Sequence, residues 1–210
     1  MAQHWTLALV ASAVLFIGAS PPSHPAAGEC SSETGGASVC LYRSLAPSVG
    51  IVVSCRDEHR CRVGYYYGNA TDVVWFTPPP GLSVLPRPEV SWLTATLAQV
   101  RVDCGRRCSW SYFFEARRRR LSAPHFSVLA VDPRRFLLAA VEDRALLVRQ
   151  LFSGREVLRL ERQWTPADWL GDVISAIHFD PDGRLSFTWL RGNERLPVSE
   201  RVSVPPVPHS

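Results

Sequence analysis

The fold is decided by two stretches of sequence, Val128-Leu-Ala-Val-Asp-Pro-Arg-Arg-Phe-Leu-Leu-Ala-Ala-Val141 and Ile174-Ser-Ala-Ile-His-Phe-Asp-Pro-Asp-Gly-Arg-Leu-Ser-Phe-Thr-Trp-Leu190. In each, an apolar run leads into Asp-Pro, a short polar turn and a second apolar run. Asp at the start of a tight turn can accept a hydrogen bond from the backbone two residues on, and Pro presets the next φ. Both stretches therefore predict β-hairpins, and the alternation from Leu185 to Trp189 predicts one apolar and one polar face.

Two further hairpins of similar design are predicted nearer the N-terminus. Ile51-Val-Val53 and Val63-Gly-Tyr-Tyr-Tyr67 flank a polar tip, and Val100-Arg-Val102 and Ser109-Trp-Ser-Tyr-Phe-Phe114 flank another. In the last run Trp110, Tyr112 and Phe114 stand at every second position, so they share one face of a strand. The sequence therefore predicts an all-β fold, an antiparallel meander of blade-like hairpins, with a compact β-sandwich as the alternative.

Residues 126–190 resemble the WD40-like repeats of bacterial β-propellers. The resemblance is carried by Val-Asp-Pro-Arg-Arg-Phe-Leu-Leu-Ala-Ala-Val at 131–141, Leu-Val-Arg-Gln-Leu-Phe-Ser-Gly-Arg-Glu-Val at 147–157 and Phe-Asp-Pro-Asp-Gly-Arg-Leu-Ser-Phe at 179–187. It implies the inner strands of one blade, its outer strand and the opening of the next blade. Because a propeller needs at least four blades of about 40 residues, it implies a small or incomplete propeller-like meander, and it bears on architecture rather than on function.

The N-terminus predicts export. Leu7 to Ile17 is an uncharged apolar run, too short to cross a bilayer of roughly 30 Å as a helix and typical of a signal-peptide core; a retained membrane anchor is the alternative. We expect a signal peptide at 1–20, a flexible arm at 21–38, a single β domain at 39–204 with a Pro-rich loop near 77–88, and a tail at 205–210. The mature protein would then be periplasmic or extracellular, without a stable membrane span.

The six cysteines favour disulfides, since an even count behind a signal peptide is typical of an oxidising compartment. Local spacing suggests three pairs, Cys30 with Cys40, Cys55 with Cys61, and Cys104 with Cys108. The alternative is a zinc site that draws on Cys55, His59, Cys61, Cys104 and Cys108. The C-x5-C and C-x3-C spacings differ from the usual C-x2-C pattern, so we expect neither a metal nor a cofactor.

Arginine supplies all 23 basic residues, and the absence of lysine excludes Schiff-base and P-loop lysine chemistry. The segment from position 101 to 120 contains seven arginines and two acidic residues. Its net charge is therefore 7 − 2 = +5, compared with +4 for the whole chain. This asymmetry predicts a patch that binds an anionic partner. A solvated loop that protects a sheet edge is the alternative. The predicted patch consists of Arg106, Arg107, Arg117, Arg118, Arg119 and Arg120.

Four side chains could act as acid, base or ligand: Asp57, Glu58, His59 and His178. The alternative is a charged hairpin tip pinned by a disulfide, together with an exposed strand histidine. The sequence holds no G-x-S-x-G, H-E-x-x-H or G-x-G-x-x-G motif, so no catalytic residue is assigned.

We therefore expect a non-enzymatic exported binding or scaffold protein that presents loops and the Arg patch to a protein or a polyanionic envelope partner. Nucleic acid is not the expected partner, because the chain has no recognised nucleic-acid-binding motif. The alternatives are a hydrolase or isomerase with a site among the β loops, and a structural accessory protein.

Overall fold

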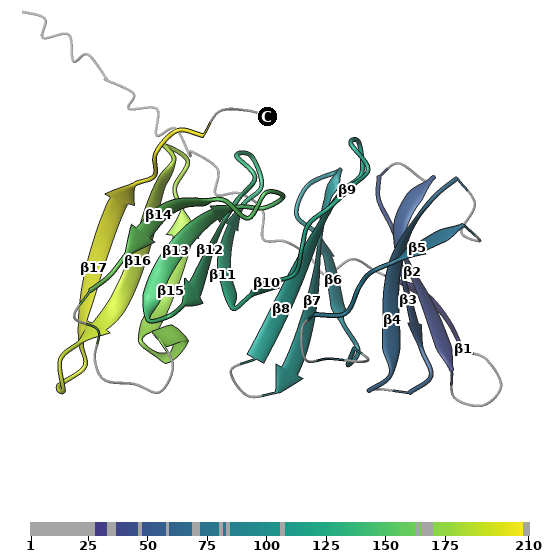
Figure 1. Ribbon diagram of the computed structural model, residues 1–210, viewed down its shortest axis with the longest axis horizontal. Helices are drawn as coiled ribbons and strands as arrows, with labels where there is room; N and C mark the ends of the chain where they lie inside the picture. Colours follow the sequence, from purple (N-terminus) through teal and green to yellow (C-terminus); the bar gives the residue numbers. More distant parts are fainter. Residues whose placement is uncertain are drawn as a thin grey trace, which may run out of the picture.

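The chain forms a row of four antiparallel β-sheets, as its computed structural model shows (Figure 1). The structure describes residues 28–32, 37–45, 48–57, 59–68, 72–79, 82, 85–105, 108–162, 164 and 170–207. The predicted signal peptide and residues 21–27 of the predicted arm lie outside these ranges. In the described part of the chain, no helix is long and apolar enough to span a bilayer.

Sheets 1 and 2 come from the N-terminal half of the described chain. Sheet 1 is a five-stranded meander in chain order. Its strands are β1 (Glu29–Ser32), β2 (Ser38–Arg43), β3 (Val49–Cys55), β4 (Cys61–Tyr67) and β5 (Val73–Trp75). In sheet 2, the short strands β9 and β10 both pair with β8. The strands of sheet 2 are β6 (Glu89–Trp92), β7 (Leu97–Gly105), β8 (Cys108–Glu115), β9 (Arg120–Leu121) and β10 (His125–Phe126).

Sheets 3 and 4 are also meanders in which neighbours in sequence are neighbours in space. Sheet 3 contains β11 (Val128–Asp132), β12 (Leu137–Glu142), β13 (Ala145–Gln150) and β14 (Glu156–Leu160). A 3-10 turn, η1 (Leu170–Asp172), leads into sheet 4, which contains β15 (Ile174–Phe179), β16 (Arg184–Arg191) and β17 (Leu196–Ser203). The four predicted hairpins are thus confirmed as β3–β4, β7–β8, β11–β12 and β15–β16. The structure has four stacked sheets, whereas the β-sandwich alternative predicts two.

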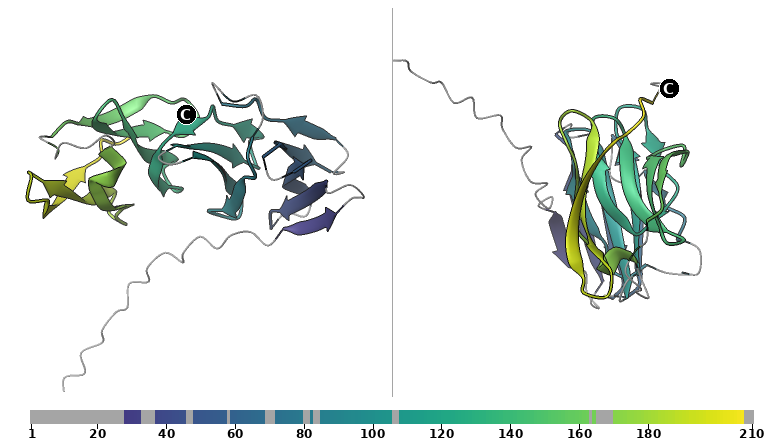
Figure 2. Two further views of the ribbon diagram at one scale, coloured as in Figure 1. Left: turned by 90° about the horizontal axis from the view of Figure 1, so that it is seen from below. Right: turned by 90° about the vertical axis from the view of Figure 1, so that its left-hand side faces the viewer.

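The sheets stack face to face, and each of the three interfaces holds its own apolar core. Figure 2 shows the row from below and from one end. On β8, Tyr112 and Phe114 pack toward sheet 1, whereas Phe113 packs toward sheet 3. Because successive side chains point to opposite faces, the inner sheets need apolar residues at every position. This explains the unbroken apolar run of β12, whose residues Leu137 to Val141 are all buried.

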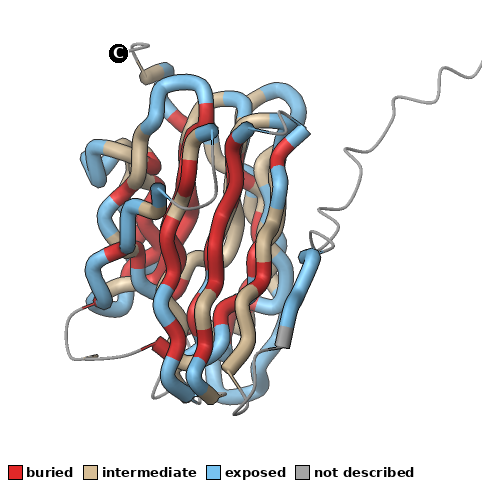
Figure 3. Tube along the Cα trace, turned by 90° about the vertical axis from the view of Figure 1, so that its right-hand side faces the viewer, coloured by how far each residue is buried: buried red, intermediate tan, exposed pale blue. Residues whose placement is uncertain are grey.

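The two end sheets each pack one face against a neighbour. On β16 the predicted alternation is confirmed, since Leu185, Phe187 and Trp189 are at most 5% exposed while Ser186 and Thr188 are half-buried. Figure 3, seen from the sheet 1 end, shows buried residues along the strands and exposed residues at the turns. The outer face of sheet 4 is therefore polar, as the outer face of a terminal sheet should be.

Three disulfides join Cys30 to Cys40, Cys55 to Cys61, and Cys104 to Cys108, as the spacing predicted. The cysteines of the zinc alternative are therefore unavailable as thiolate ligands. Among the described residues, no group of three His, Cys, Asp or Glu side chains is arranged to hold a metal ion. All three bridges lie in sheets 1 and 2.

Two chain segments differ from expectation. Residues 29–32, predicted within the flexible arm, form β1, because Cys30 lies directly opposite Cys40 in the β1–β2 ladder and is bonded to it. At the other terminus, Val204 is 8% exposed and Val207 packs beside it on the core between sheets 3 and 4. The first part of the predicted tail therefore belongs to the folded domain.

The turns fall at two ends of the sheets. The upper end, uppermost in Figure 1, carries the connections β8–β9, β11–β12, β13–β14 and β15–β16. The lower end carries the connections β3–β4, β7–β8, β12–β13 and β16–β17. These two ends differ sharply in how they arrange their charges.

Candidate functional site

The most basic feature of the upper end is the β8–β9 turn at 116–119. Glu115, the last residue of β8, is 4% exposed, and its carboxylate accepts hydrogen bonds from the backbone nitrogens of Arg117 and Arg118 at 3.2 and 2.8 Å. A carboxylate that accepts two backbone N–H groups fixes the turn around it. The side chains of Arg117, Arg118 and Arg119 are exposed. The turn therefore presents its positive charges to solvent and buries its negative one.

Arg119 and Arg120 contact the two sheets that flank sheet 2. The guanidinium carbon of Arg119 lies 4.5 Å from the ring centroid of Tyr67 in sheet 1. That of Arg120 lies 4.2 Å from the ring centroid of Phe152, just after β13 of sheet 3. Such cation–π contacts orient the guanidinium groups and leave their N–H edges as donors. One hairpin tip thus bridges three sheets.

Tyr67 of sheet 1 contacts the β8–β9 turn through its hydroxyl as well as through its ring. Its hydroxyl donates a hydrogen bond to the carbonyl oxygen of Ala116 at 3.3 Å. Burial, followed by the neighbouring Tyr65, raises the pKa of Tyr67 to about 12. The hydroxyl therefore stays protonated, and keeps donating to the turn, throughout the physiological pH range.

Sheet 3 repeats the pairing of a buried carboxylate with outward arginines. Asp132 is 8% exposed and accepts hydrogen bonds from the backbone nitrogens of Arg134 and Arg135 at 3.0 and 3.2 Å, as predicted for Asp at the start of this turn. The Arg135 side chain pairs with Asp132 and donates to the carbonyl of Gly183 in sheet 4 at 2.7 Å. Arg134 and, in the β13–β14 turn, Arg155 are exposed. Sheet 3 therefore adds two outward arginines to the upper end.

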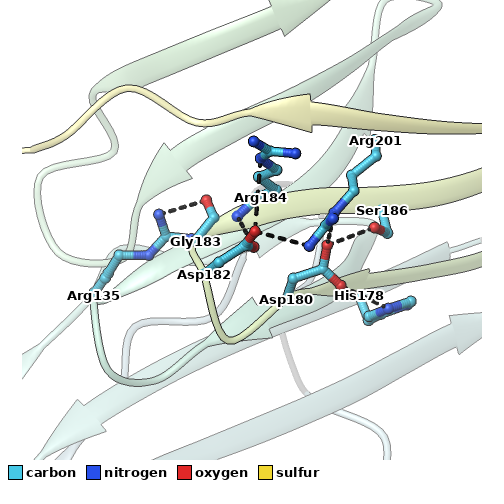
Figure 4. A network of polar contacts seen from close by, with 8 residues as sticks. All are labelled: Arg135, His178, Asp180, Asp182, Gly183, Arg184, Ser186 and Arg201. Atoms are coloured by element: carbon cyan, nitrogen blue, oxygen red, sulfur yellow. Dashed lines mark hydrogen bonds and ion pairs between the residues drawn. The ribbon is translucent and has the colours of Figure 1, made fainter.

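In sheet 4, charged side chains of the upper end pair with one another (Figure 4). The side chain of Asp180 is 12% exposed and accepts from Ser186 Oγ at 2.7 Å and from Arg201 Nε at 2.6 Å. The Ser186 hydrogen bond and then the Arg201 contact hold the pKa of Asp180 below its usual range. Arg201 also reaches Asp182 at 2.8 Å. The outward arginines of the upper end therefore belong to sheets 2 and 3.

Acidic and basic side chains alternate on the surface of the lower end. Asp57 and Arg60 form an exposed ion pair at 2.5 Å, and hydrogen bonds from Arg60 and then from the His59 backbone hold the pKa of Asp57 below its usual range. In the β12–β13 turn, Asp143 and Arg144 are both exposed. Charges of opposite sign this close together largely cancel at a distance.

Part of the predicted Arg patch lies in the described chain. Arg106 and Arg107 lie outside the described residues. Arg117, Arg118, Arg119 and Arg120 remain together at the upper end.

The catalytic candidates lie in different sheets. Asp57 and His59 lie at the lower end of sheet 1, and Glu58 between them is outside the described residues. His178 lies on β15 in sheet 4, at the other end of the row. Among the described candidates, Asp57 and His59 therefore share one turn, and His178 lies apart from them.

The cluster around His178 also lacks the order of a catalytic triad. The Asp180 carboxylate lies between the other two groups, 3.1 Å from the His178 imidazole and 2.7 Å from the Ser186 hydroxyl. In a Ser-His-Asp triad the imidazole lies between hydroxyl and carboxylate and takes the hydroxyl proton. Here Ser186 donates to one carboxylate oxygen, and the His178 imidazole contacts the other.

Sequence reasoning missed four residues of the upper end: Arg134, Arg155, Tyr67 and Phe152. Alternation of turns in a meander predicts that the β11–β12 and β13–β14 turns share one end of sheet 3. It does not place that end beside the β8–β9 turn, because β9 and β10 both run antiparallel to β8 and the alternation is interrupted there. No local signal identifies the two rings, since their contacts with Arg119 and Arg120 join different sheets.

Compared with known proteins, the chain matches no protein-family model and no curated protein sequence. The site must therefore be interpreted from its own geometry.

Proposed function

We propose that this protein is a non-enzymatic binding scaffold that acts outside the cytoplasm and holds an anionic partner at the upper end of its sheets. Three disulfides are compatible with an oxidising compartment. The stacked sheets provide a rigid support, and the function resides in the turns that they hold. The resemblance to WD40-like repeats remains a prediction about the architecture of this support.

The segregation of charge by burial carries the proposal. In the turns of sheets 2 and 3 at the upper end, the carboxylates of Glu115 and Asp132 are buried, while Arg117, Arg119 and Arg134 are exposed. None of these three arginines takes part in an ion pair among the described residues. Exposed guanidinium groups that are not held in an ion pair attract anions and can bind them bidentately.

Two triple variants with the same loss of charge test this proposal. One changes Arg117, Arg118 and Arg119 to Gln at the upper end. The control changes Arg56, Arg144 and Arg195 to Gln, three exposed arginines of the lower end. Arg120 stays unchanged, because its stacking on Phe152 gives it a structural role.

The measurement is the salt concentration that elutes each protein from phosphocellulose. We expect the upper-end variant to elute at clearly lower salt than the wild type, and the control close to the wild type, because the binding arginines are confined to one end. Equal shifts for both variants would show that only net charge matters and would overturn the proposal.

A further inference from the structure

The arginines of the upper end continue from one sheet to the next. Arg119 lies against Tyr67 of sheet 1, and Arg120 lies against Phe152 of sheet 3. Phe152 packs against Phe136 with ring centroids 5.7 Å apart, and Phe136 follows directly on Arg135. Side-chain contacts therefore connect the tips of sheets 1, 2 and 3 into a continuous line that runs across the strands.

The outward arginines follow the same line. Arg117, Arg118 and Arg119 occupy the tip of sheet 2, and Arg134 and Arg155 occupy two turns of sheet 3. Stacked sheets lie about 10 Å apart, so the line from Tyr67 to the turns of sheet 3 extends over roughly 20 Å. A single small anion cannot contact arginines spread over that distance.

The geometry of the guanidinium groups favours phosphate over carboxylate. The ring of Tyr67 covers one face of Arg119, which leaves the N–H edge of this exposed arginine to bind. A tetrahedral phosphate offers oxygens in several directions and can accept from two arginines that are not coplanar. A carboxylate offers only two oxygens, both in one plane, so it brings fewer acceptors to guanidinium groups that are not coplanar.

The apolar surface of this end does not suit a membrane. Membrane-surface binding combines cations with apolar side chains that insert among the lipids. The rings of Tyr67, Phe136 and Phe152 are partly buried. Of the exposed large apolar side chains among the described residues, Leu45 lies in the β2–β3 connection at the upper end, and Val74 and Trp75 lie on β5, which begins at that end. All three belong to sheet 1, so they provide no insertion beside the outward arginines of sheets 2 and 3.

We infer that the upper end binds a linear polymer carrying repeated phosphate groups, which lies across the tips of sheets 2 and 3 and reaches toward sheet 1. This inference rests on the proposed function and adds to it the class and the shape of the ligand. Arg117, Arg118 and Arg119 bind one stretch of the polymer, and Arg134 and Arg155 bind the next. Affinity then rises with polymer length until the chain spans both sheets.

The test measures dissociation constants for inorganic triphosphate and for inorganic polyphosphate of several tens of phosphates, with the full disulfide-bonded protein. The diagnostic variant is Arg134→Gln with Arg155→Gln on sheet 3. Its control is Arg56→Gln with Arg144→Gln, which removes the same charge at the lower end. Polyglutamate of similar length and vesicles of anionic phospholipid complete the set.

We expect polyphosphate to bind the wild type much more tightly per phosphate than triphosphate. The sheet 3 variant should weaken polyphosphate binding roughly tenfold and reduce its salt dependence by one to two ion equivalents, with little change for triphosphate. The control should lower polyphosphate affinity much less. The variant of Arg117, Arg118 and Arg119 should weaken both phosphate ligands.

The outcomes separate the two proposals. If triphosphate and polyphosphate bind the wild type equally per phosphate, or if the sheet 3 variant equals its control, the linear polymer is overturned while anion binding at the tip of sheet 2 stands. Equal affinity for polyglutamate would overturn phosphate as the ligand, and tighter binding to vesicles would overturn the polymer in favour of a membrane. If the Arg117, Arg118 and Arg119 variant binds every anion like the wild type, the proposed function itself fails.

Discussion

The two ends of the sheets stabilise the same kind of hairpin by different means. At the upper end, the carboxylates of Glu115 and Asp132 hold the turns of sheets 2 and 3 through backbone hydrogen bonds. At the lower end, disulfides close the hairpins of sheets 1 and 2 at Cys55–Cys61 and Cys104–Cys108. In both upper turns the carboxylate is buried beneath the turn, whereas Arg117, Arg119 and Arg134 are exposed. The upper turns of sheets 2 and 3 therefore present mainly positive charge to solvent.

The largest expected effect concerns the covalent closure of the lower end. Changing Cys55 and Cys61 together to Ala should lower the free energy of unfolding by about 2–3 kcal/mol, because the unfolded chain gains entropy and both cysteines are buried. Denaturant unfolding measures this loss. Elution from phosphocellulose should remain that of the wild type, and a drop in retention would show that the two ends do not act separately.

Removing the carboxylate that holds an upper turn should lower the free energy of unfolding nearly as much. Asp132→Ala leaves the backbone nitrogens of Arg134 and Arg135 without their acceptor, which should cost about 2 kcal/mol in the free energy of unfolding. Glu194→Ala, in an exposed turn of the lower end, serves as control and should change stability by less than about 0.5 kcal/mol. Similar losses for both variants would contradict the contrast between the ends.

Alkaline pH should weaken the support of the upper tip. The pKa of Tyr67 is raised to about 12 in the folded protein, above the usual value of about 10 in an unfolded chain. The corresponding stability is complete below about pH 10 and is lost as the pH rises from there toward 12. Tyr67→Phe should flatten this part of the stability profile, as followed by denaturant unfolding at several pH values. A profile as steep as that of the wild type would exclude Tyr67 as its source.

The smallest expected effect distinguishes the outward arginines from the stacked one. Changing Arg117 and Arg134 to Gln should alter the unfolding free energy by less than about 0.5 kcal/mol, since their side chains are exposed and make no ion pair or cation–π contact among the described residues. Arg120→Gln should cost about 1 kcal/mol, because it removes the contact with Phe152. Thermal unfolding compares the two, and the reverse order would contradict the assignment of Arg120 to structure.

The sequence predicted the features that are formed by residues close together in the chain. The Asp-Pro turn at Asp132, the three disulfide pairs and the alternation around Phe187 depend on residues close together in the chain, and each is confirmed. Turn chemistry and strand periodicity act over a few residues, so they can be recognised without knowledge of the neighbours in space.

Contacts between residues of different sheets could not be predicted from the sequence. Arg119 and Tyr67 are 52 positions apart, since 119 − 67 = 52, and they meet only because sheets 1 and 2 stack. Glu115 ends an aromatic strand, and no sequence pattern distinguishes a buried glutamate that accepts from a turn from an exposed one. The predicted patch therefore contained the arginines of the β8–β9 turn but not the side chains that contact them, and its members Arg106 and Arg107 lie outside the described residues.

The location of a bound phosphate polymer tests the central claim most directly. Backbone amide and arginine Nε–Hε resonances can be followed by NMR as inorganic polyphosphate is added to the disulfide-bonded protein. We expect shifts confined to the turns at 116–119, 133–136 and 151–155, with the lower-end resonances of Arg56, Arg144 and Arg195 unchanged. Shifts at both ends in proportion to exposed charge, or at neither end, would contradict a binding site built by the upper turns.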